Sequence, residues 1–343
     1  MLELDGSYGE GGGQLVRTAV ALSAITGRAV AIRNVRANRD KPGLAPQHVA
    51  AVRAAAALAG ASVEGVQLRS QSIRFTPRAP GGGSFRFDVG TAGSVTLLLQ
   101  ALLPVMIASG KPCDAEIIGG TDVRMAPPLD YFREVLLGLL SRMGVQVRLE
   151  VRRRGYYPRG GGEVRVSVSP SALRPVAFDA PGALRSISGL AHVANLPEHI
   201  AMRMRASALE RLAPLKDVTP DIACRVLGPD EAIGPGGAIV AWAHTDRTVL
   251  GAGRTAERGV RAEALGEAAG EELATDLAVG AAVDLHAADQ LLVYFALAQG
   301  GALTTRAVSL HAHTCIWLIE QFLPVRFQVS QAGVLSRIAL AAP

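Results

Sequence analysis

Cysteines are few in this sequence, and long apolar runs are missing. The three cysteines, Cys113, Cys224 and Cys315, are far apart and never form a Cys-x-x-Cys pair. Neither a disulfide framework nor a zinc site is therefore expected, and we expect the cysteines to be buried as small hydrophobic side chains. The longest apolar stretches, such as residues 97–108, are well short of the roughly 20 residues that span a bilayer. No membrane association is expected.

Lysine is also scarce, which removes common ways of binding or attacking a nucleotide. It occurs only at Lys41, Lys111 and Lys216, and none of these lies in the Lys-x-Asp-Gly pattern of a lysine-adenylating ligase. The only Gly-Lys pair, Gly110-Lys111, precedes Pro112 rather than serine or threonine, so no Walker A loop exists. A nucleotide bound by this protein would be held in another way.

The remaining composition is that of a globular protein. Apolar residues make up 49% of the 343 residues, charged residues 19% and aromatic residues 4%, and the length predicts roughly two domains. The net charge of +5 favours an anionic partner. The N-terminal residues Met1-Leu-Glu-Leu-Asp5 show neither a basic start nor an apolar signal core, so we expect an intracellular, cytoplasmic protein.

A repeated order of elements predicts an α/β (α+β) fold. Helices over residues 12–26 and 46–58 alternate with a strand over 28–35 and strands up to residue 76. The same order returns with helices over 93–109 and 128–143 and strands over 114–118, 145–151 and 163–168. It returns again with helices over 288–299 and 314–322 and strands over 304–310, 325–329 and 334–340. We read each of these helices as ending at glycine, which favours a left-handed C-cap.

The segment between the second and third repeats breaks this order. It predicts strands over residues 185–193 and 237–243 and helices over 200–212 and 263–276. We therefore expect one large domain, residues 1–180 and 277–343, built of three similar units. A smaller α/β domain, residues 181–276, is inserted ahead of the third unit.

Two N-terminal features favour an anion site. Gly9-Glu10-Gly-Gly-Gly-Gln14 opens the first helix, where free backbone N–H groups attract phosphate or carboxylate, although a tight turn without a ligand is an equal reading. Arginines and a lysine crowd a strand end and its loop, and forked guanidinium groups match phosphate oxygens. These side chains favour a polyphosphate or RNA-phosphate pocket over a solvated basic face. They are Arg33, Arg36, Arg39 and Lys41, with Arg17 one turn after Gln14.

His311 and His313 lie where the third unit's first predicted strand ends and its second helix begins. Side chains two residues apart on a strand face opposite ways, so a shared metal is not expected. The helix dipole disfavours a cationic histidine there, which keeps the imidazole available as a nucleophile. A structural histidine is the commoner reading of such a position, and the chemistry alone does not separate the two histidines.

Two further groups of residues carry expectations. Asp289 and Gln290 are placed at the start of the third unit's first helix, where Asp289 is either an acid stabilised by the helix dipole or part of a site in which the helix starts of the three units converge. Arg152-Arg153-Arg154 is expected on an exposed strand or hairpin.

Taken together, six segments resemble the RNA 3′-terminal phosphate cyclases over nearly the whole chain. They are Gly9–Gln14 with Arg17; Arg36–Arg39 with Lys41-Pro-Gly43 and Gln47-His48; Gly90-Thr-Ala-Gly-Ser94 with Gln100; Gly119-Gly-Thr-Asp122 with Pro127-Pro128; Ala288-Asp-Gln290; and His311-x-x-Thr314 ahead of Phe322–Phe327. The resemblance implies the same three-unit domain with an insert.

The resemblance also implies an ATP-dependent reaction in three steps. A histidine takes AMP from ATP, the AMP passes to an RNA 3′-phosphate to give an RNA(3′)pp(5′)A end, and the ribose 2′-OH displaces AMP to leave a 2′,3′-cyclic phosphate. Adenylylation gives an unreactive phosphate a good leaving group beside a nucleophile already in reach. A divalent ion, Mg²⁺ or Mn²⁺, is implied for the triphosphate, with Glu10 as its carboxylate.

Residue roles follow from the same resemblance. His311, rather than His313, matches the nucleophile, because its spacing to Thr314 and to Phe322–Phe327 fits the family. Pro127 matches one face of an adenine sandwich, and His286 stands where the bacterial members have the tyrosine of the other face. The remaining matches are phosphate and nucleotide contacts, namely Arg17, Arg36, Arg39, Gln47, Gln100, Asp289 and Gln290.

Two other functions share this architecture. A cyclase-like ribosome-assembly factor without catalysis is expected to lack the nucleophilic histidine and several pocket residues, which this sequence has. An enolpyruvyl transferase of related repeated architecture needs a phosphoenolpyruvate pocket and forms no enzyme-AMP intermediate. The natural RNA and the oligomeric state are not indicated by the sequence.

Overall fold

The computed structural model of the protein describes residues 1–215 and 218–341, so Lys216 lies outside the described residues. The first unit consists of β1 (Leu2–Asp5), α1 (Gly13–Thr26), β2 (Val30–Arg33), α2 (Pro46–Ala59), β3 (Ser62–Glu64) and β4 (Ile73–Thr76). Its strands form a sheet in the order β1-β2-β4-β3. β1 and β2 are parallel, and β4 is antiparallel to both of its neighbours.

The second unit repeats this arrangement. It consists of β5 (Gly83–Asp88), α3 (Val95–Ala108), β6 (Cys113–Gly119), a continuous helical segment of α4 (Leu129–Tyr131), the π-helical η1 (Phe132–Leu136) and α5 (Leu137–Arg142), then β7 (Gln146–Gly155) and β8 (Gly162–Ser169). The strand order is β5-β6-β8-β7, with β5 and β6 parallel and the other neighbours antiparallel.

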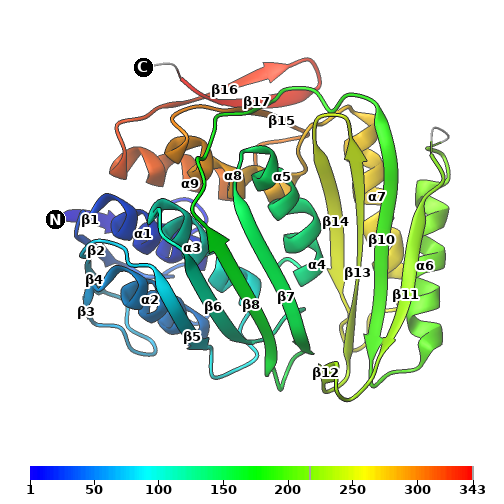
Figure 1. Ribbon diagram of the computed structural model, residues 1–343, viewed down its shortest axis with the longest axis horizontal. Coiled ribbons are helices and arrows are strands. Elements are labelled where there is room, and N and C mark those ends of the chain that lie inside the picture. Colours follow the sequence, from blue (N-terminus) through cyan, green and yellow to red (C-terminus); the bar gives the residue numbers. More distant parts are fainter. Residues whose placement is uncertain (216–217, 342–343) are drawn as a thin grey trace.

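The third unit has the same topology but is interrupted after its first strand. It consists of β9 (Ala177–Phe178), α8 (Leu285–Leu297), β15 (Ala302–Thr305), α9 (Leu310–Phe322), β16 (Phe327–Ala332) and β17 (Leu335–Leu340). The order β9-β15-β17-β16 has one parallel pair and two antiparallel pairs. The predicted α/β class with three repeated units is therefore confirmed, and Figure 1 shows the three sheets on different sides of the helices.

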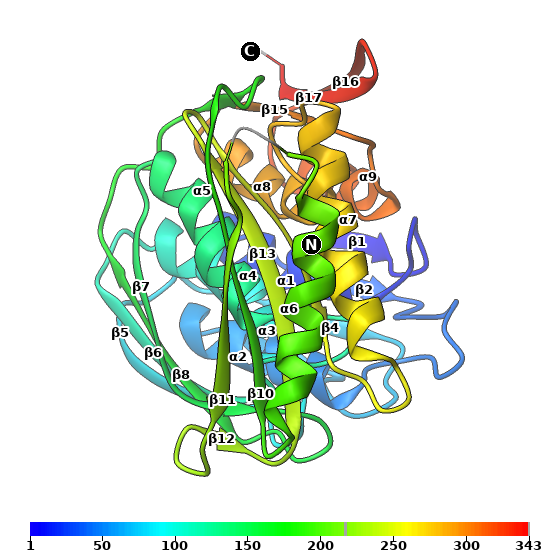
Figure 2. The ribbon, with the colours of Figure 1, turned by 90° about the vertical axis from the view of Figure 1, so that its right-hand side faces the viewer.

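The chain between β9 and α8 forms a further layer. It contains β10 (Leu184–Ala194), α6 (Glu198–Leu212), β11 (Asp221–Leu227), β12 (Ala232–Ile233), β13 (Gly236–Thr245), β14 (Val249–Thr255) and α7 (Ala262–Ala278). Strands β11-β10-β13-β14 form one sheet, and α6 and α7 lie side by side over one of its faces (Figure 2). β12 instead joins the second unit's sheet beside β7.

Hydrophobic burial follows the same division. One buried cluster fills the space among the helices and sheets of the three units. A second lies between the sheet that contains β10 and the helices α6 and α7. Helices α1, α3, α8 and α9, which come from all three units, pack together inside the first cluster. In the described ranges, 1–215 and 218–341, no helix has the length and apolarity needed to cross a membrane.

Several predicted element bounds are wrong. Each unit begins with a strand, β1, β5 or β9, that the periodicity did not predict, and β11 and β14 were not predicted either. The strand predicted over 304–310 ends at Thr305, and α9 begins at Leu310. The signal for this start is Ser309, whose hydroxyl accepts a hydrogen bond from the Ala312 N–H at 3.0 Å, as an N-cap does.

The predicted glycines end the helices in the first two units but not in the third. Gly27 and Gly60 take the left-handed conformation after α1 and α2, with φ of 70° and 55°. In the second unit Gly110 and Gly144 are left-handed, with φ of 64° and 88°. In the third unit Gln299, not Gly300, has this conformation (φ 54°). Helix α8 also begins three residues earlier than predicted, because Asp284 is its N-cap and accepts hydrogen bonds from the His286 and Ala287 N–H groups.

Candidate functional site

The glycine-rich loop before α1 is held against α9 of the third unit. The backbone N–H of Glu10 donates to Thr314 Oγ1 at 3.2 Å, and Thr314 donates to the Leu310 carbonyl at 2.8 Å. Gly9 has φ of 59°, and a Cβ there would lie 2.3 Å from Thr314 Oγ1. Only glycine therefore allows this loop to approach α9 so closely.

His311 lies in the first turn of α9 with a half-exposed side chain. The prediction that His311 closes a strand is therefore wrong. His313 is also exposed, and two residues on a helix differ by about 200° around its axis. The two histidines therefore point to different sides, as expected, although the reason is helical rather than extended geometry.

A hydrogen-bonded chain joins His311 to the first and third units. His311 Nδ1 lies 2.8 Å from Gln14 Oε1, and Gln14 Nε2 donates to Asp289 Oδ2 at 2.5 Å. Because the Asp289 carboxylate accepts from the Gln14 amide nitrogen, the Gln14 oxygen faces the imidazole. The bond to His311 then requires a proton on Nδ1, which leaves Nε2 of the neutral ring with its lone pair free.

Glu10 and Arg39 also lie near His311 Nδ1. Their side chains form an ion pair, and Glu10 Oε2 is 3.7 Å from His311 Nδ1. The Glu10 side chain is 16% exposed, whereas that of Arg39 is 41% exposed. The structure thus brings the predicted carboxylate, one predicted phosphate contact and the predicted nucleophile together.

A pocket opens beside this chain where helices of all three units meet. It is lined by Gln14, Arg17, Gln100, Asp289 and Gln290 together with Thr18, Ala21, Pro104, Leu136, Val293, Tyr294 and Cys315. The helices of the three units therefore converge here, although Asp289 and Gln290 lie in the second turn of α8 rather than at its start.

Burial gives two charged groups of the pocket unusual properties. It lowers the pKa of Arg17 to about 10, against the effect of Asp289, and raises the pKa of Asp289 to about 6, against His311 and His286. Arg17 Nε has no hydrogen-bond partner among the residues the structure describes. An incompletely bonded buried guanidinium is suited to an anionic ligand.

A second polar chain runs from the pocket to the inserted segment. Gln100 Nε2 donates to Gln290 Oε1 at 2.9 Å, and Gln290 Nε2 donates to the His286 carbonyl at 2.5 Å. The His286 imidazole lies 3.1 Å from Glu272 of α7, and this bond raises its pKa. Glu272 also pairs with Arg254 at 2.6 Å, and sequence reasoning missed it because its partners are distant in the chain.

Three predicted contacts are not part of these hydrogen-bonded chains. Arg36 donates to the carbonyls of Gly43 (2.7 Å) and Lys41 (3.0 Å), so it closes its own loop. The Pro127 carbonyl accepts from Thr96 at 2.8 Å. Gln47 lies against Gly93, which stands just before α3, and a Cβ on Gly93 would be 3.0 Å from the Gln47 Cβ.

Two residues had no role in the sequence prediction although they belong to quoted motifs. Gln14 is one, and the other is the buried His48, whose Nδ1 accepts from the Ala45 N–H at 3.1 Å. Burial, together with the charges of Arg17 and Arg36, lowers the pKa of His48 to about 3. His48 is therefore neutral and packs against α1, where a Cβ on Gly13 would lie 2.0 Å from its Nε2.

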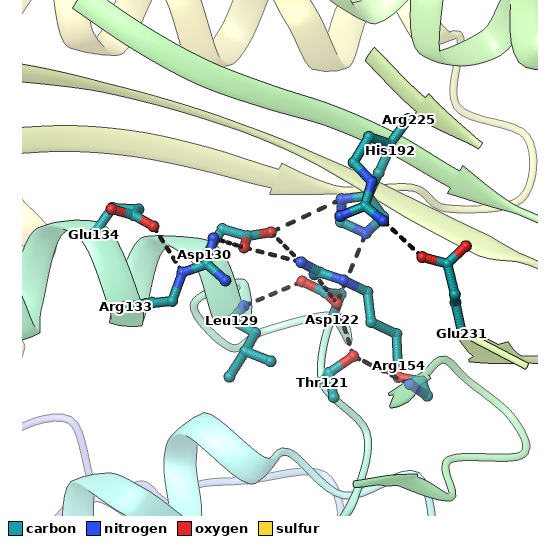
Figure 3. A network of polar contacts seen from close by, with 11 residues as sticks. Thr121, Asp122, Leu129, Asp130, Arg133, Glu134, Arg154, His192, Arg225 and Glu231 are labelled. Atoms are coloured by element: carbon teal, nitrogen blue, oxygen red, sulfur yellow. Dashed lines mark hydrogen bonds and ion pairs between the residues drawn. The ribbon is translucent and has the colours of Figure 1, made fainter. Parts of the chain in front are cut away.

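Arg154 corrects the prediction of an exposed arginine run. It is buried and donates to Asp122 Oδ2 (2.9 Å) and to both Asp130 oxygens (2.9 and 2.7 Å), as Figure 3 shows. His192 of β10 lies within 3.9 Å of both carboxylates, so the network joins the second unit to the inserted segment. Arg152 alone fits the expectation, with a half-exposed side chain paired to Glu163. Arg154 is buried and Arg152 is not, because buried carboxylates are available to pair with Arg154.

The three cysteines are free thiols in the structure. Cys113 and Cys315 are buried and Cys224 is half-buried, and burial raises the pKa of each. Over the described residues 1–215 and 218–341, no group of three or more histidine, cysteine or acidic side chains is arranged to hold a metal ion.

The similarity of this chain to known proteins shows to which family of enzymes it belongs. A family model for RNA 3′-terminal phosphate cyclase matches residues 8–329. A protein of that name from Nitrosospira multiformis is 55% identical over 98% of this chain and 96% of its own length. Another from Pyrobaculum neutrophilum is 44% identical (97% and 96%), and one from Methanopyrus kandleri 43% (96% and 95%). The chain belongs to the RNA 3′-terminal phosphate cyclase family.

Proposed function

We propose that the protein converts an RNA 3′-terminal phosphate to a 2′,3′-cyclic phosphate at the expense of ATP, with His311 as the nucleophile. The observation that carries this proposal is the hydrogen bond between His311 Nδ1 and Gln14 Oε1 at 2.8 Å. It holds the ring in the tautomer whose Nε2 can attack. Family membership supplies the substrate class, and the buried Arg17 beside the histidine supports a phosphorylated one.

In the first step the lone pair of His311 Nε2 attacks the α-phosphorus of ATP. The Nε2–P bond forms, the bond from the α-phosphorus to the bridging oxygen breaks, and pyrophosphate leaves. Nδ1 keeps its proton, and the positive charge that develops on the ring is stabilised by Gln14 and by Glu10, whose Oε2 lies 3.7 Å away. The product is a histidinyl-AMP phosphoramidate.

In the second step an oxygen of the RNA 3′-phosphate attacks the same phosphorus, the Nε2–P bond breaks, and an RNA(3′)pp(5′)A end forms. In the third step the neighbouring 2′-OH loses its proton and attacks the 3′-phosphorus. AMP departs, and the 2′,3′-cyclic phosphate remains. The 2′-OH is covalently attached to the reacting end, which gives this last step its high effective concentration.

The residues that match the family's contacts, inside the pocket and around it, are proposed to hold the nucleotide and the RNA phosphate. Cationic side chains bind the phosphates, amides and the buried carboxylate bind the nucleotide, and Pro127 with His286 encloses the adenine. The cations are Arg17, Arg36 and Arg39; the other contacts are Gln47, Gln100, Asp289 and Gln290. The hydrogen bonds of Arg36 within its loop leave it fewer donors for phosphate than Arg17 has.

Glu10 fits a divalent cation that arrives with ATP. It is the one predicted metal-binding carboxylate, lies next to His311, and is not accompanied by a full ligand set in the described parts of the chain. Mg²⁺ commonly uses one or two protein carboxylates together with substrate phosphates and water. Such an ion would neutralise charge on the departing pyrophosphate, after Arg39 releases Glu10.

The experiment that tests this proposal is transfer of label from ATP to the protein. The protein is incubated with α-labelled ATP and Mg²⁺ or Mn²⁺, and acid-labile, alkali-stable label on the chain is measured. We expect labelling that disappears in His311→Ala and persists in His313→Ala. Loss in His313→Ala alone would overturn the nucleophile assignment, and no labelling under any condition would favour a non-catalytic assembly factor.

Product analysis tests the later steps. An RNA with a 3′-phosphate should yield the cyclic end, whereas the same RNA with a 2′-deoxy terminal sugar should stall as the adenylylated RNA. Equal turnover of both RNAs would contradict attack by the 2′-OH.

A further inference from the structure

Two aromatic rings stack on one another next to the histidine site. The centroids of Tyr8 and Trp317 are 3.9 Å apart, and the ring planes differ by 20°. Trp317 is half-buried against the core of the three units, whereas Tyr8 is 44% exposed. The chain has only 15 phenylalanine, tyrosine and tryptophan residues, and in the described structure Tyr8 and Tyr157 are the exposed ones. An exposed ring is thus the exception in this protein.

The pair is attached to the site through the same contacts that hold the glycine-rich loop. Tyr8 lies two residues before Glu10, whose N–H donates to Thr314 Oγ1 at 3.2 Å. Trp317 follows Thr314 by three residues and His311 by six on α9. Six residues correspond to about 9 Å along a helix, which is about two to three stacked nucleotides at ~3.4 Å each.

Cationic side chains lie on the loop that is bonded to the residues on either side of Tyr8. The loop of residues 36–41 lies beside the Tyr8 loop, because Asn38 Nδ2 donates to the Ser7 carbonyl at 3.2 Å and Arg39 pairs with Glu10. The loop presents the exposed Lys41 and the 41% exposed Arg39 side chain. Proteins bind single-stranded nucleic acid by this combination, in which cations follow the phosphates and aromatic rings stack on the bases.

We propose that Tyr8, supported by Trp317, is a stacking platform for a base upstream of the RNA 3′ end, and that it favours single-stranded substrates longer than a dinucleotide. This inference rests on the proposed function, since it takes the 3′-phosphate to lie at His311. Stacking on a π face accepts any base. The platform therefore selects an unpaired strand and not a sequence.

The first test separates RNA binding from the attack on ATP. In Tyr8→Ala we expect an unchanged rate of protein labelling from ATP without RNA. The KM for an RNA of about ten nucleotides should rise about 5- to 150-fold, the range for loss of one stacked base. Tyr8→Phe should keep the wild-type KM. Tyr157→Ala, the matched change at the exposed tyrosine between β7 and β8, should have no effect on it. For a dinucleotide ending in a 3′-phosphate, wild type and Tyr8→Ala should be alike.

An unchanged KM for the longer RNA in Tyr8→Ala would overturn the platform. Slower labelling from ATP would do so as well, because it would show that Tyr8 acts only by holding the Glu10 loop. An equal loss with the dinucleotide would give the ring a role at the terminal nucleotide instead, which also contradicts the proposal.

A second measurement needs no turnover. Trp242→Phe leaves Trp317 as the sole tryptophan, and titration with the 3′-phosphorylated RNA in the absence of ATP should change its fluorescence in the Tyr8 protein and much less in a Tyr8→Ala background. No change at RNA concentrations far above the KM would refute stacking at this pair. Because this titration uses no ATP, it still tests the platform if labelling of His311 fails.

Discussion

Replacing Arg154 with methionine should destabilise the protein strongly. The guanidinium is buried and makes three hydrogen bonds of 2.7–2.9 Å to Asp122 and Asp130, both of which are buried. Methionine has a similar apolar volume but leaves Asp122 without its arginine and Asp130 with Arg133 alone, at 3.0 Å. Removing one partner of a buried ion pair costs about 3–5 kcal/mol. For one cooperative transition of a chain this long, that loss corresponds to a fall in Tm of roughly 4–7 °C.

The loss should depend on pH in a defined direction. Burial raises the pKa of Asp122, but the charges of Arg154 and His192 outweigh burial and hold it below its ordinary value of 3.8. The stabilisation is therefore present above pH 3.8 and is lost as the pH falls through the folded pKa. Without Arg154, burial dominates and the carboxyl takes up a proton more readily. The deficit of Arg154→Met should thus be larger at pH 8 than at pH 5.

Arg152→Met is the matched control, two residues away on β7. Its side chain is 42% exposed and pairs with Glu163 at 2.9 Å, and such surface pairs contribute about 0–1 kcal/mol. Thermal melting followed by circular dichroism at pH 5 and pH 8 compares the two variants. Equal melting temperatures for Arg152→Met and Arg154→Met, or a deficit that grows as the pH falls, would refute the reasoning.

Two further predictions concern the site and its border. Gln14→Leu removes the acceptor for His311 Nδ1–H, so single-turnover labelling from ATP should slow about 10- to 100-fold, the cost of one strong hydrogen bond; an unchanged rate would show that the amide does not set the tautomer. Burial raises the pKa of Asp276 to about 7, against Arg306, so the charged form disfavours folding and stability falls between about pH 4 and 7. Asp276→Asn should therefore gain on wild type as the pH rises from 5 to 8, by at most about 3 kcal/mol. Urea unfolding curves with the same difference at both pH values would contradict this.

The repeated order of elements made the fold accessible from local patterns. The helices α1, α2 and α3 were predicted within two residues at each end, because each carries a long apolar pattern bounded by glycine or by a cap. Strands β1, β5 and β9 were missed because they are two to six residues long and lie at the edges of their sheets. Short edge strands have too few residues to show a period. The division at residues 181 and 276 stays a prediction, and α7 continues past it to Ala278.

Local sequence alone determined that His311, Glu10, Arg17 and Asp289 are the residues to examine, because glycine-rich turns, helix starts and family motifs are written in consecutive positions. Only the tertiary structure decided how they act together. Gln14 meets His311 across 297 residues and Asp289 across 275, and Arg154 is buried while Arg152 two residues away is not. Such contacts depend on how three similar units pack around their helices, and burial then sets which charges are paired, shifted or free. No spacing along the chain encodes that packing.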